Sequence, residues 1–405
     1  MTVSSQIANP SLTPLELDAQ SLAQLDPLCG NYLLYPRPEK FLPYARQDDY
    51  LQAAKRGASY SASLSLDLGG SQQLFATRLE QEIALQGQVV GKLFRIHHLQ
   101  FRGHSVCEAT LSTLLHCVRK HFSLLPNCEL GLMLALADLP GTDLAHWGAH
   151  GFRQLQLSVQ ADEPMQGLAT VLALARQHRF DAIRINLCFG SKQQPLLALA
   201  RSLNAIIASE PDQIALSPNA PNHEHLCWCI KRLHAAGYYY LGAYFFTKAQ
   251  NALVRAKRQG RLHRDLQGYT TQNSNNHIGC GLGATSSLGN YYFQNTNQTD
   301  IYQHALMNNS LPLARSLSLN MDDLLRRIVI QLLICQFELS IQALELSYPI
   351  RFQHYFANEL IQLQDMAQRG WISIEPEQLQ VMQKGELFIY QICAIFDRYH
   401  EPSLR

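Results

Sequence analysis

The chain has 405 residues, of which 47% are hydrophobic and 16% charged, and its formal net charge is +1. This balance of charge excludes a basic footprint for nucleic acid, and no apolar run approaches the roughly 18 residues that a membrane-spanning helix needs. The N-terminus lacks a basic stretch followed by an apolar core, so we expect no signal peptide, and we expect the scattered cysteines to be reduced thiols of a cytoplasmic protein.

Residues 1–58 are predicted to form an N-terminal arm that wraps around the main domain. This stretch is irregular and contains several prolines. In the run Tyr35-Pro36-Arg37-Pro38, each residue before a proline is kept out of the helical region of backbone space. This part of the arm is therefore predicted to be extended.

Residues 59–300 are predicted to form an α/β domain, because strand and helix patterns alternate along them. Leu64, Leu66 and Leu68 have the spacing of a strand, and Leu79 and Ile83 have the spacing of a helix. We expect strands near residues 63–68, 93–101, 129–137, 155–159, 183–187 and 213–216. Strict alternation predicts a parallel sheet with helices outside, and about six units predict a partial barrel rather than the full eight-unit barrel.

Residues 301–405 are predicted to form a C-terminal helical domain. Leu324, Ile328 and Leu332 recur at helix spacing, and short strand patterns near residues 370–374 and 379–381 lie between two further helices. This order of helices and a small hairpin resembles a winged-helix module.

The segment from Gly260 to Asn295 carries the most specific signal in the chain. Its residues 279–287 are small, which allows the backbone to approach a ligand or another backbone closely. Phenol, hydroxyl and amide side chains precede them at residues 269–272, and aromatics and amides follow at residues 291–295. The composition is that of a pocket wall or of a glycine-rich connection between two domains.

This segment resembles the C-terminal signature of the oxygen-independent coproporphyrinogen III oxidases, which are radical S-adenosylmethionine (SAM) enzymes of haem biosynthesis. The matching residues are Gly260, Leu262, Arg264, Gln267, Gly268, Tyr269, Thr270, Thr271, Gln272, Gly279, Gly281, Ala284, Ser286, Tyr292, Gln294 and Asn295. A weaker match lies near the start of the chain, at residues 32–36. The resemblance implies a radical-SAM-type partial (β/α)6 barrel and a C-terminal domain that covers the substrate cleft and does not bind DNA.

The resemblance also implies two sets of site residues. The remnant of the cofactor pocket would comprise Gln160, Gly279, Gly281, Ala284 and Ser286. The substrate side would comprise Tyr35, Arg37, Arg264, Tyr269, Thr270, Thr271 and Gln272, with the two arginines as candidate partners for propionate carboxylates.

The sequence departs from the family pattern where the radical chemistry would take place. The family holds its [4Fe–4S] cluster with a C-x3-C-x2-C motif after the first barrel strand, but this motif occurs nowhere in the chain and no cysteine lies between Cys29 and Cys107. The close pair Cys227 and Cys229 is expected to be structural. The glycine-rich SAM motif after the second strand is reduced to Arg-Gly-His-Ser-Val at residues 102–106, and the aspartate of the fifth strand is Asn186.

These departures predict a homologue that has lost both the cluster and SAM, with no catalytic residue, no bound metal and no cofactor other than a porphyrin or haem. We expect it to bind a tetrapyrrole or to regulate haem synthesis, with a protein partner in haem metabolism left open. Two alternatives stay open: an active coproporphyrinogen III oxidase and a protein-interaction scaffold. His223 and His225 stay open as axial haem ligands, and the aromatic run at residues 238–246 as a surface for stacking on a macrocycle.

Overall fold

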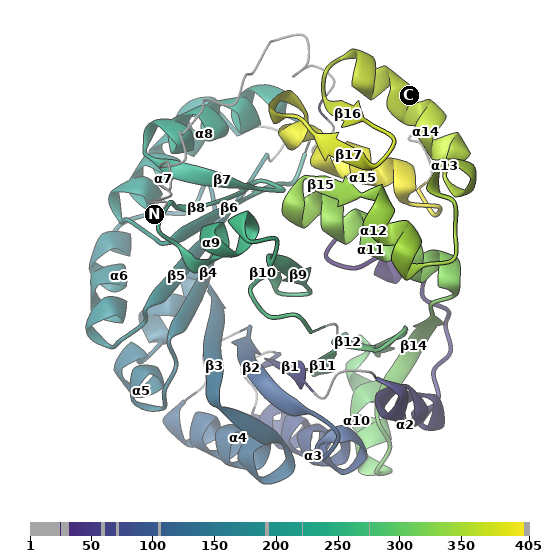
Figure 1. The fold of residues 1–405 in the computed structure, drawn as a ribbon. Helices are drawn as coiled ribbons and strands as arrows, with labels where there is room; N and C mark the ends of the chain where they lie inside the picture. Colours follow the sequence, from purple (N-terminus) through teal and green to yellow (C-terminus); the bar gives the residue numbers. More distant parts are fainter. Residues whose placement is uncertain are drawn as a thin grey trace, which may run out of the picture.

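The computed structural model describes residues 25, 32–57, 61–69, 73–103, 107–190, 194–220, 222–274 and 276–400. Strands form an open ring with helices on its outside, and the C-terminal helices close the ring at one side (Figure 1). Residues 104–106, which include most of the predicted SAM-motif remnant, lie outside the described residues, as do residues 70–72 after the first strand and residues 1–24 and 26–31 of the predicted arm.

Six parallel strands in sequence order form the barrel, so the predicted six-unit partial barrel is confirmed. The strands are β1 (Ser61–Asp67), β2 (Arg95–Arg102), β3 (Ser123–Ala135), β4 (Gln154–Gln160), β5 (Ala182–Phe189) and β6 (Gln213–Pro218). The helices that cover them are α3 (Gln73–Val90), α4 (Glu108–His121), α5 (Leu144–Ala149), α6 (Leu168–Gln177), α7 (Leu196–Ala208) and α8 (His223–Ala235), with a short 3-10 turn η2 (Leu136–Gly141) after β3.

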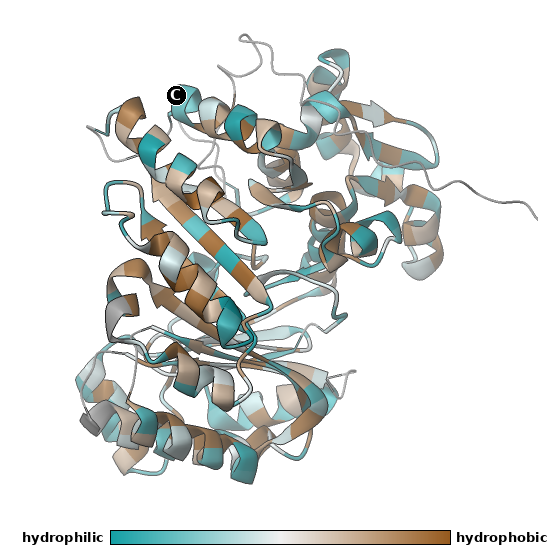
Figure 2. Cartoon of the chain, turned by 90° about the vertical axis from the view of Figure 1, so that its left-hand side faces the viewer, coloured by the Kyte–Doolittle hydropathy of each residue, from teal (hydrophilic) through white to brown (hydrophobic). Residues whose placement is uncertain are grey.

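The strands alternate between an apolar outer face and a polar inner face. Leu64, Leu155 and Ile185 point to the helices and are fully buried, whereas Gln156 and Arg184 line the interior. Successive side chains of a strand point to opposite faces. The strands therefore present an apolar face to the surrounding helices and a polar, hydrogen-bonding face to the interior of the barrel. The hydropathy colours show the same alternation along the strands (Figure 2).

Further strands extend the sheet at both edges. On the β1 side the order is β11, β12, β13 and β14, and on the β6 side it is β8 and β7. Their bounds are β7 (Tyr238–Gly242), β8 (Phe245–Lys248), β11 (His277–Cys280), β12 (Thr285–Leu288), β13 (Tyr291–Asn295) and β14 (Leu313–Ser318). Helix α9 (Ala252–Arg258) follows β8, and α10 (Thr299–Met307) lies between β13 and β14. Residues 301–318, predicted as the start of the C-terminal domain, thus belong with the sheet, because β14 pairs antiparallel with β13.

A separate hairpin of β9 (His263–Asp265) and β10 (Gly268–Thr270) lies in the middle of the molecule (Figure 1). Its turn is bonded to the barrel, since Arg184 Nη1 donates to the carbonyl of Gln267 at 3.0 Å. Its second strand is bonded to the C-terminal domain, since the Tyr269 hydroxyl donates to the carbonyl of Ile334 at 3.2 Å. The hairpin therefore joins the two parts of the chain.

The C-terminal domain combines helices with a three-stranded antiparallel sheet of order β15-β17-β16. Its helices are α11 (Met321–Gln336), α12 (Ile341–Ser347), α13 (Phe352–Tyr355), α14 (Ala357–Gln368), the 3-10 turn η3 (Gln383–Phe388) and α15 (Ile389–Phe396). Its strands are β15 (Glu338–Ser340), β16 (Ile372–Ile374) and β17 (Gln378–Val381). Helix α11 begins with a capping box, in which Asn320 and Asp323 satisfy each other's backbone N–H groups.

The N-terminal segment 32–57 lies along the C-terminal domain and the edge of the sheet. It contains η1 (Pro38–Lys40) and α2 (Gln47–Arg56). The Tyr292 hydroxyl donates to the carbonyl of Tyr35 at 3.0 Å, and Leu42 forms a β-bridge with Ser316 of the edge strand β14. In the described part of the chain, no helix has both the length and the apolar character that crossing a lipid bilayer demands.

Candidate ligand-binding cleft

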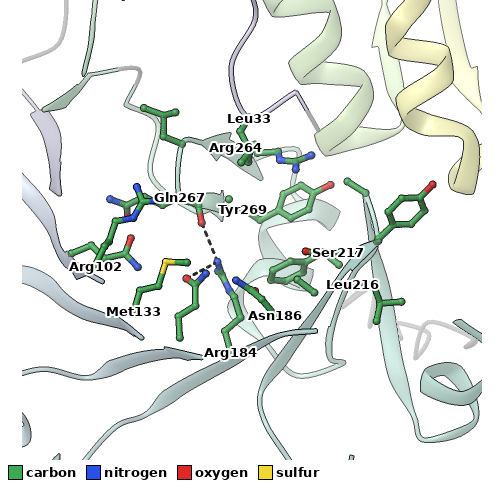
Figure 3. A pocket seen from close by; sticks show the side chains of 18 of the residues that line it. Leu33, Arg102, Met133, Arg184, Asn186, Leu216, Ser217, Arg264, Gln267 and Tyr269 are labelled. Atoms are coloured by element: carbon green, nitrogen blue, oxygen red, sulfur yellow. Dashed lines mark hydrogen bonds between the residues drawn. The ribbon is translucent and has the colours of Figure 1, made fainter. Parts of the chain in front are cut away.

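A cleft of about 460 Å³ opens inside the barrel (Figure 3). Its wall combines the inner faces of β2–β6, the β9–β10 hairpin, the N-terminal segment and α15. The lining residues are Leu33, Gln100, Arg102, Met133, Gln156, Arg184, Asn186, Ala215, Leu216, Ser217, Pro218, Ala243, Tyr244, Phe245, Arg264, Leu266, Gln267, Gly268, Tyr269 and Tyr390. A cleft of this size lies within the range of roughly 300–1,000 Å³ that is typical of small-molecule sites.

The charge of this cleft is one-sided. Three arginines line it, Arg102 from β2, Arg184 from β5 and Arg264 from β9, and its described lining contains no aspartate or glutamate. Guanidinium groups recognise carboxylates and phosphates through paired hydrogen bonds. The positive charge of the described lining therefore favours an anionic ligand.

Arg184 is held in place by uncharged oxygens. Its Nε donates to Gln213 Oε1 at 2.9 Å, and its Nη1 donates to the Gln267 carbonyl at 3.0 Å and lies 3.5 Å from Gln156 Oε1. Its Cζ lies 4.9 Å from the ring centroid of Phe245. Burial lowers the pKa of Arg184 to about 10, an effect that the nearby Asp265 opposes and Arg264 reinforces.

Arg264 lies between two tyrosine rings on the far side of the hairpin. Its Cζ is 5.1 Å from the ring centroid of Tyr269 and 5.8 Å from that of Tyr390. Its Nη2 donates to the Tyr390 hydroxyl at 3.2 Å, whereas its Nε and Nη1 are buried and have no hydrogen-bond partner among the described residues. This side chain keeps donors available beside the cleft.

Aromatic side chains from the β7–β8 turn and the start of β8, the hairpin and α15 form part of the wall. Phe245 meets Tyr269 edge-on with ring centroids 5.4 Å apart, and Tyr244 meets Tyr390 in the same way at 5.5 Å. Such edge-to-face contacts fix the rings in place. All four residues are buried, so their rings form a packed apolar wall next to the cations of the cleft.

A second cavity of about 240 Å³ lies below the hairpin, toward the amino ends of the strands. It shares Gln100, Gln156, Arg184, Gln267 and Tyr269 with the cleft, so these side chains separate the two spaces. The remaining wall is mixed and includes acidic, amide and apolar side chains.

The predicted substrate residues divide among these spaces. Arg264 and Tyr269 line the cleft, whereas Thr270, Thr271 and Gln272 line the second cavity. Tyr35 is buried beside a much smaller cavity of about 30 Å³ under the N-terminal segment. Arg37 precedes η1 and lies in none of the cavities described here.

The predicted cofactor residues lie away from the cleft. Gly279 and Ser286 face each other in the β11–β12 hairpin, where Gly279 N–H donates to Ser286 Oγ at 3.0 Å, and Ala284 precedes β12 in the turn of this hairpin. Gly281 has φ of +119°, and a β-carbon there would lie 2.7 Å from the backbone oxygen of Asp67. These small residues therefore allow two backbones to pack, while Gln160 is exposed at the carboxyl end of β4.

Behind that hairpin lies a buried carboxyl group, Glu82 of α3. Its Oε2 accepts from Gly281 N–H at 2.8 Å and from the Tyr302 hydroxyl at 2.6 Å, and its Oε1 accepts from Asn295 Nδ2 at 2.6 Å. Burial raises its pKa to about 7, against the hydrogen bonds that lower it. This network ties α3, α10 and the end of the family-like segment together.

His223 and His225, kept open as haem ligands, begin helix α8 and line none of the cavities described.

Sequence reasoning did not assign five polar residues that line the cleft to the site: Gln100, Arg102, Gln156, Arg184 and Gln267. A signal for the strand residues existed: parallel strands covered on both faces are normally continuous apolar runs, so polar side chains at every second position of β4 and β5 indicated a polar interior.

Comparisons with known proteins agree with this architecture. Residues 319–388 match the family model of the HemN C-terminal domain. The chain is 29% identical over 367 residues to the oxygen-independent coproporphyrinogen III oxidase of Pseudomonas aeruginosa, covering 82% of this chain and 80% of that protein. It is also 29% identical over 359 residues to the enzyme of the same name from Synechocystis, covering 79% and 77%.

One solved structure matches almost the whole fold: the coproporphyrinogen III oxidase (HemN) of Escherichia coli, described as a radical SAM enzyme. The TM-score is 0.84 at 26% identity, and the match covers 93% of this chain and all of that one. The chain is therefore HemN-like in sequence and in fold. Its partial barrel and C-terminal domain are the HemN arrangement, so the cleft described above lies inside a barrel of the radical SAM type.

The residues that follow β1 in this HemN-like chain do not fit a [4Fe–4S] cluster. Such a cluster is held by thiolates, but positions 68–72 are Leu, Gly, Gly, Ser and Gln. Cys227 and Cys229 are buried on α8. Among the residues that the structure describes, no group of three or more histidine, cysteine or acidic side chains is placed to hold a metal ion.

Proposed function

We propose that this protein is a HemN homologue without radical SAM chemistry that binds a carboxylated tetrapyrrole, either to carry it or to regulate haem synthesis in the cytoplasm. The relatives are named coproporphyrinogen III oxidases, so a tetrapyrrole is the ligand class that the family suggests. A protein that receives or senses this ligand would be its partner.

The observation that carries the proposal is the composition of the cleft. Three arginines and four aromatic rings line it, and the lining that the structure describes contains no acidic side chain. A porphyrin is a flat, largely apolar macrocycle with carboxylates on its rim. Rings that stack on the macrocycle and guanidinium groups that bind its carboxylates are the two kinds of contact that such a ligand needs.

The loss of the cofactors is supported by the sequence. The chain lacks the C-x3-C-x2-C motif, and the family's aspartate on the fifth strand is Asn186. In this structure Asn186 lines the cleft beside Arg184. Changes at the thiolate positions and on this strand together favour loss of the radical chemistry over a variant of it.

Absorbance titration with coproporphyrin III and with haem tests ligand binding. We expect a shifted spectrum and a dissociation constant of micromolar or tighter, which corresponds to about 8 kcal/mol. Arg369→Gln is a control: Arg369 follows α14, is paired with Asp365 on the surface and does not line the cleft, so the titration should be unchanged. If neither spectrum shifts at protein concentrations well above micromolar, the proposal fails and the scaffold alternative replaces it.

Anaerobic reconstitution with iron and sulfide tests the loss of the cluster. We expect no stoichiometric iron after desalting, because the thiolate set is missing. Iron near four atoms per chain with the absorbance of a [4Fe–4S] cluster would instead support the active oxidase.

A further inference from the structure

The cleft holds three half-buried arginines and more positive charge than its described lining neutralises. Arg184 bonds to two glutamine side-chain oxygens and one carbonyl, all uncharged. Within the described ranges, neither Arg184 nor Arg264 forms an ion pair with a carboxylate. A cation that is partly withdrawn from water and has no ion-pair partner is costly to hold, so an anion bound beside it would be stabilised.

Asp265 is an acidic residue whose charge acts on both arginines, but it balances only part of their charge. Its Oδ1 accepts from the backbone N–H of Gln267 at 2.8 Å, so it caps the turn of the hairpin. It lies in the second cavity below the hairpin rather than in the lining of the cleft. One carboxyl group also cannot balance two guanidinium groups, and Arg102 adds a third on the same cleft.

The open donors of Arg264 show where an anion would bind. Its Nε and Nη1 are buried without a hydrogen-bond partner among the described residues, and the same side chain lines the cleft. Tyr269 and Tyr390 fix the plane of the guanidinium from two sides. Arg184 approaches the cleft from β5, on the other side of the hairpin (Figure 3).

We propose that the ligand itself supplies the missing counter-charge, through at least two separated carboxylates, one bound at Arg264 and one at Arg184. This inference rests on the proposed function for the macrocycle but assigns the anion subsites independently of it. It follows that these two arginines contribute to the affinity for the ligand more than to the stability of the ligand-free protein. Removing either should weaken binding of the ligand much more than it destabilises the empty protein, although Arg184 also donates to the Gln267 carbonyl.

The test compares Arg184→Met and Arg264→Met with the wild type by thermal melting and by titration. Methionine keeps an unbranched chain of similar volume and removes the charge. We expect the melting temperature of the ligand-free variants to stay within about 2 °C of the wild type or to rise. We expect the affinity for coproporphyrin III to fall at least about tenfold in each, because one partner of a charged pair is lost. Arg184→Lys keeps the positive charge but loses the paired donors of the guanidinium. Its affinity for coproporphyrin III should therefore lie between those of the wild type and Arg184→Met.

Benzene-1,3,5-tricarboxylate separates this inference from the proposed function. At millimolar concentration it should raise the melting temperature of the wild type and not of either methionine variant. That result with no porphyrin binding would support the anion subsites and overturn the tetrapyrrole proposal. Equal porphyrin affinity in the wild type and both variants would overturn the subsites and leave the proposal intact. A fall of several degrees in both ligand-free variants would also overturn them, because the arginines would then be structural.

Discussion

Half-buried arginines in two regions of this molecule have opposite kinds of partner. In the C-terminal domain, Arg326 Nε donates to both oxygens of Asp322 at 2.9 and 3.1 Å, and its Nη1 donates to Glu359 Oε1 at 2.8 Å. In the cleft, Arg184 meets only uncharged oxygens among the hydrogen bonds described for it. Burial lowers the pKa of Arg326, but the hydrogen bonds that it donates to these carboxylates outweigh burial and raise the pKa. Burial lowers the pKa of Arg184 to about 10.

The difference indicates that the charge of Arg326 stabilises the fold, whereas the charge of Arg184 is available to a ligand. A guanidinium with two carboxylates satisfies its charge inside the protein, so its loss strands those carboxylates. The positive charge of a guanidinium with only neutral partners is not neutralised by the protein, so it can attract an anionic ligand that enters the cavity. The same residue type therefore has opposite expected effects on stability in the two regions.

The largest expected effect is that of Arg326→Met. Asp322 and Glu359 would lose their shared partner while partly buried, and the Phe396 carbonyl would lose a donor at 3.0 Å. Asp322 keeps Arg398 and Tyr355 as partners, so we expect a loss of about 3 kcal/mol, the low end of the range for breaking a buried pair. Urea unfolding monitored by circular dichroism measures this loss.

Arg369→Gln is the control for that measurement. Its ion pair with Asp365 is on the surface of α14, with the side chains 38% and 66% exposed, so we expect a change within about 0.5 kcal/mol. If Arg326→Met and Arg184→Met lowered the unfolding free energy equally, the contrast between the two regions would disappear.

The acid Glu82 resembles Arg184 in having only uncharged partners, since the hydrogen bonds described for it come from neutral donors. Its pKa is about 7 in the folded chain against an ordinary value of 4.5. Between these pH values the unfolded chain has released the proton and the folded chain has not, so stability falls as pH rises from about 4.5 to 7 and is level outside this window. The total fall from this group is about 3 kcal/mol.

Glu82→Gln should remove this part of the pH dependence. Unfolding free energies of the wild type and the variant, measured from pH 4.5 to 8, should therefore differ by an amount that changes by about 3 kcal/mol across the window. A constant difference would mean that Glu82 ionises in the folded protein as it does in the unfolded one.

The contrast also shows what a sequence can predict. The order of strands and helices came from periodicity, because apolar spacing follows directly from which face meets the helices. The boundary at residue 300 did not, because nothing local marks β14 as the partner of β13. Pairing between distant strands depends on the whole sheet and leaves little trace in either segment.

The site was predicted in part, for a related reason. Arg264 and Tyr269 reach the cleft, but Gly279 and Gly281 do not. A glycine needed for contact with a ligand and one needed for contact with backbone look alike in a sequence, and here Gly281 packs against Asp67. Arg184 was missed because its meaning depends on which carboxylates are absent around it in three dimensions.

Tyr390→Phe should have a smaller effect that falls mainly on binding. It removes the hydroxyl that accepts from Arg264 Nη2 at 3.2 Å. We expect a loss of about 1.5 kcal/mol or slightly more in coproporphyrin affinity, because this hydrogen bond orients a charged group. Titration measures it, and Tyr238→Phe is the matched control, since its hydroxyl donates to the Pro211 carbonyl outside the cleft. Equal affinities in the two variants would show that Arg264 is not oriented for the ligand.

The smallest expected effect is that of salt on porphyrin binding. Raising the ionic strength from 0.1 to 1 M shortens the screening length from about 10 to about 3 Å, which suppresses attraction between exposed charges but reaches buried pairs far less. Arg184 and Arg264 are enclosed by the barrel, the hairpin and α15, so their attraction for carboxylates should persist. We therefore expect the affinity for coproporphyrin III to fall by less than about fivefold, or about 1 kcal/mol, as measured by titration at both salt concentrations. A fall of a hundredfold or more would place the attraction on exposed cations such as Arg37 and would remove the distinction between the cleft arginines and the surface.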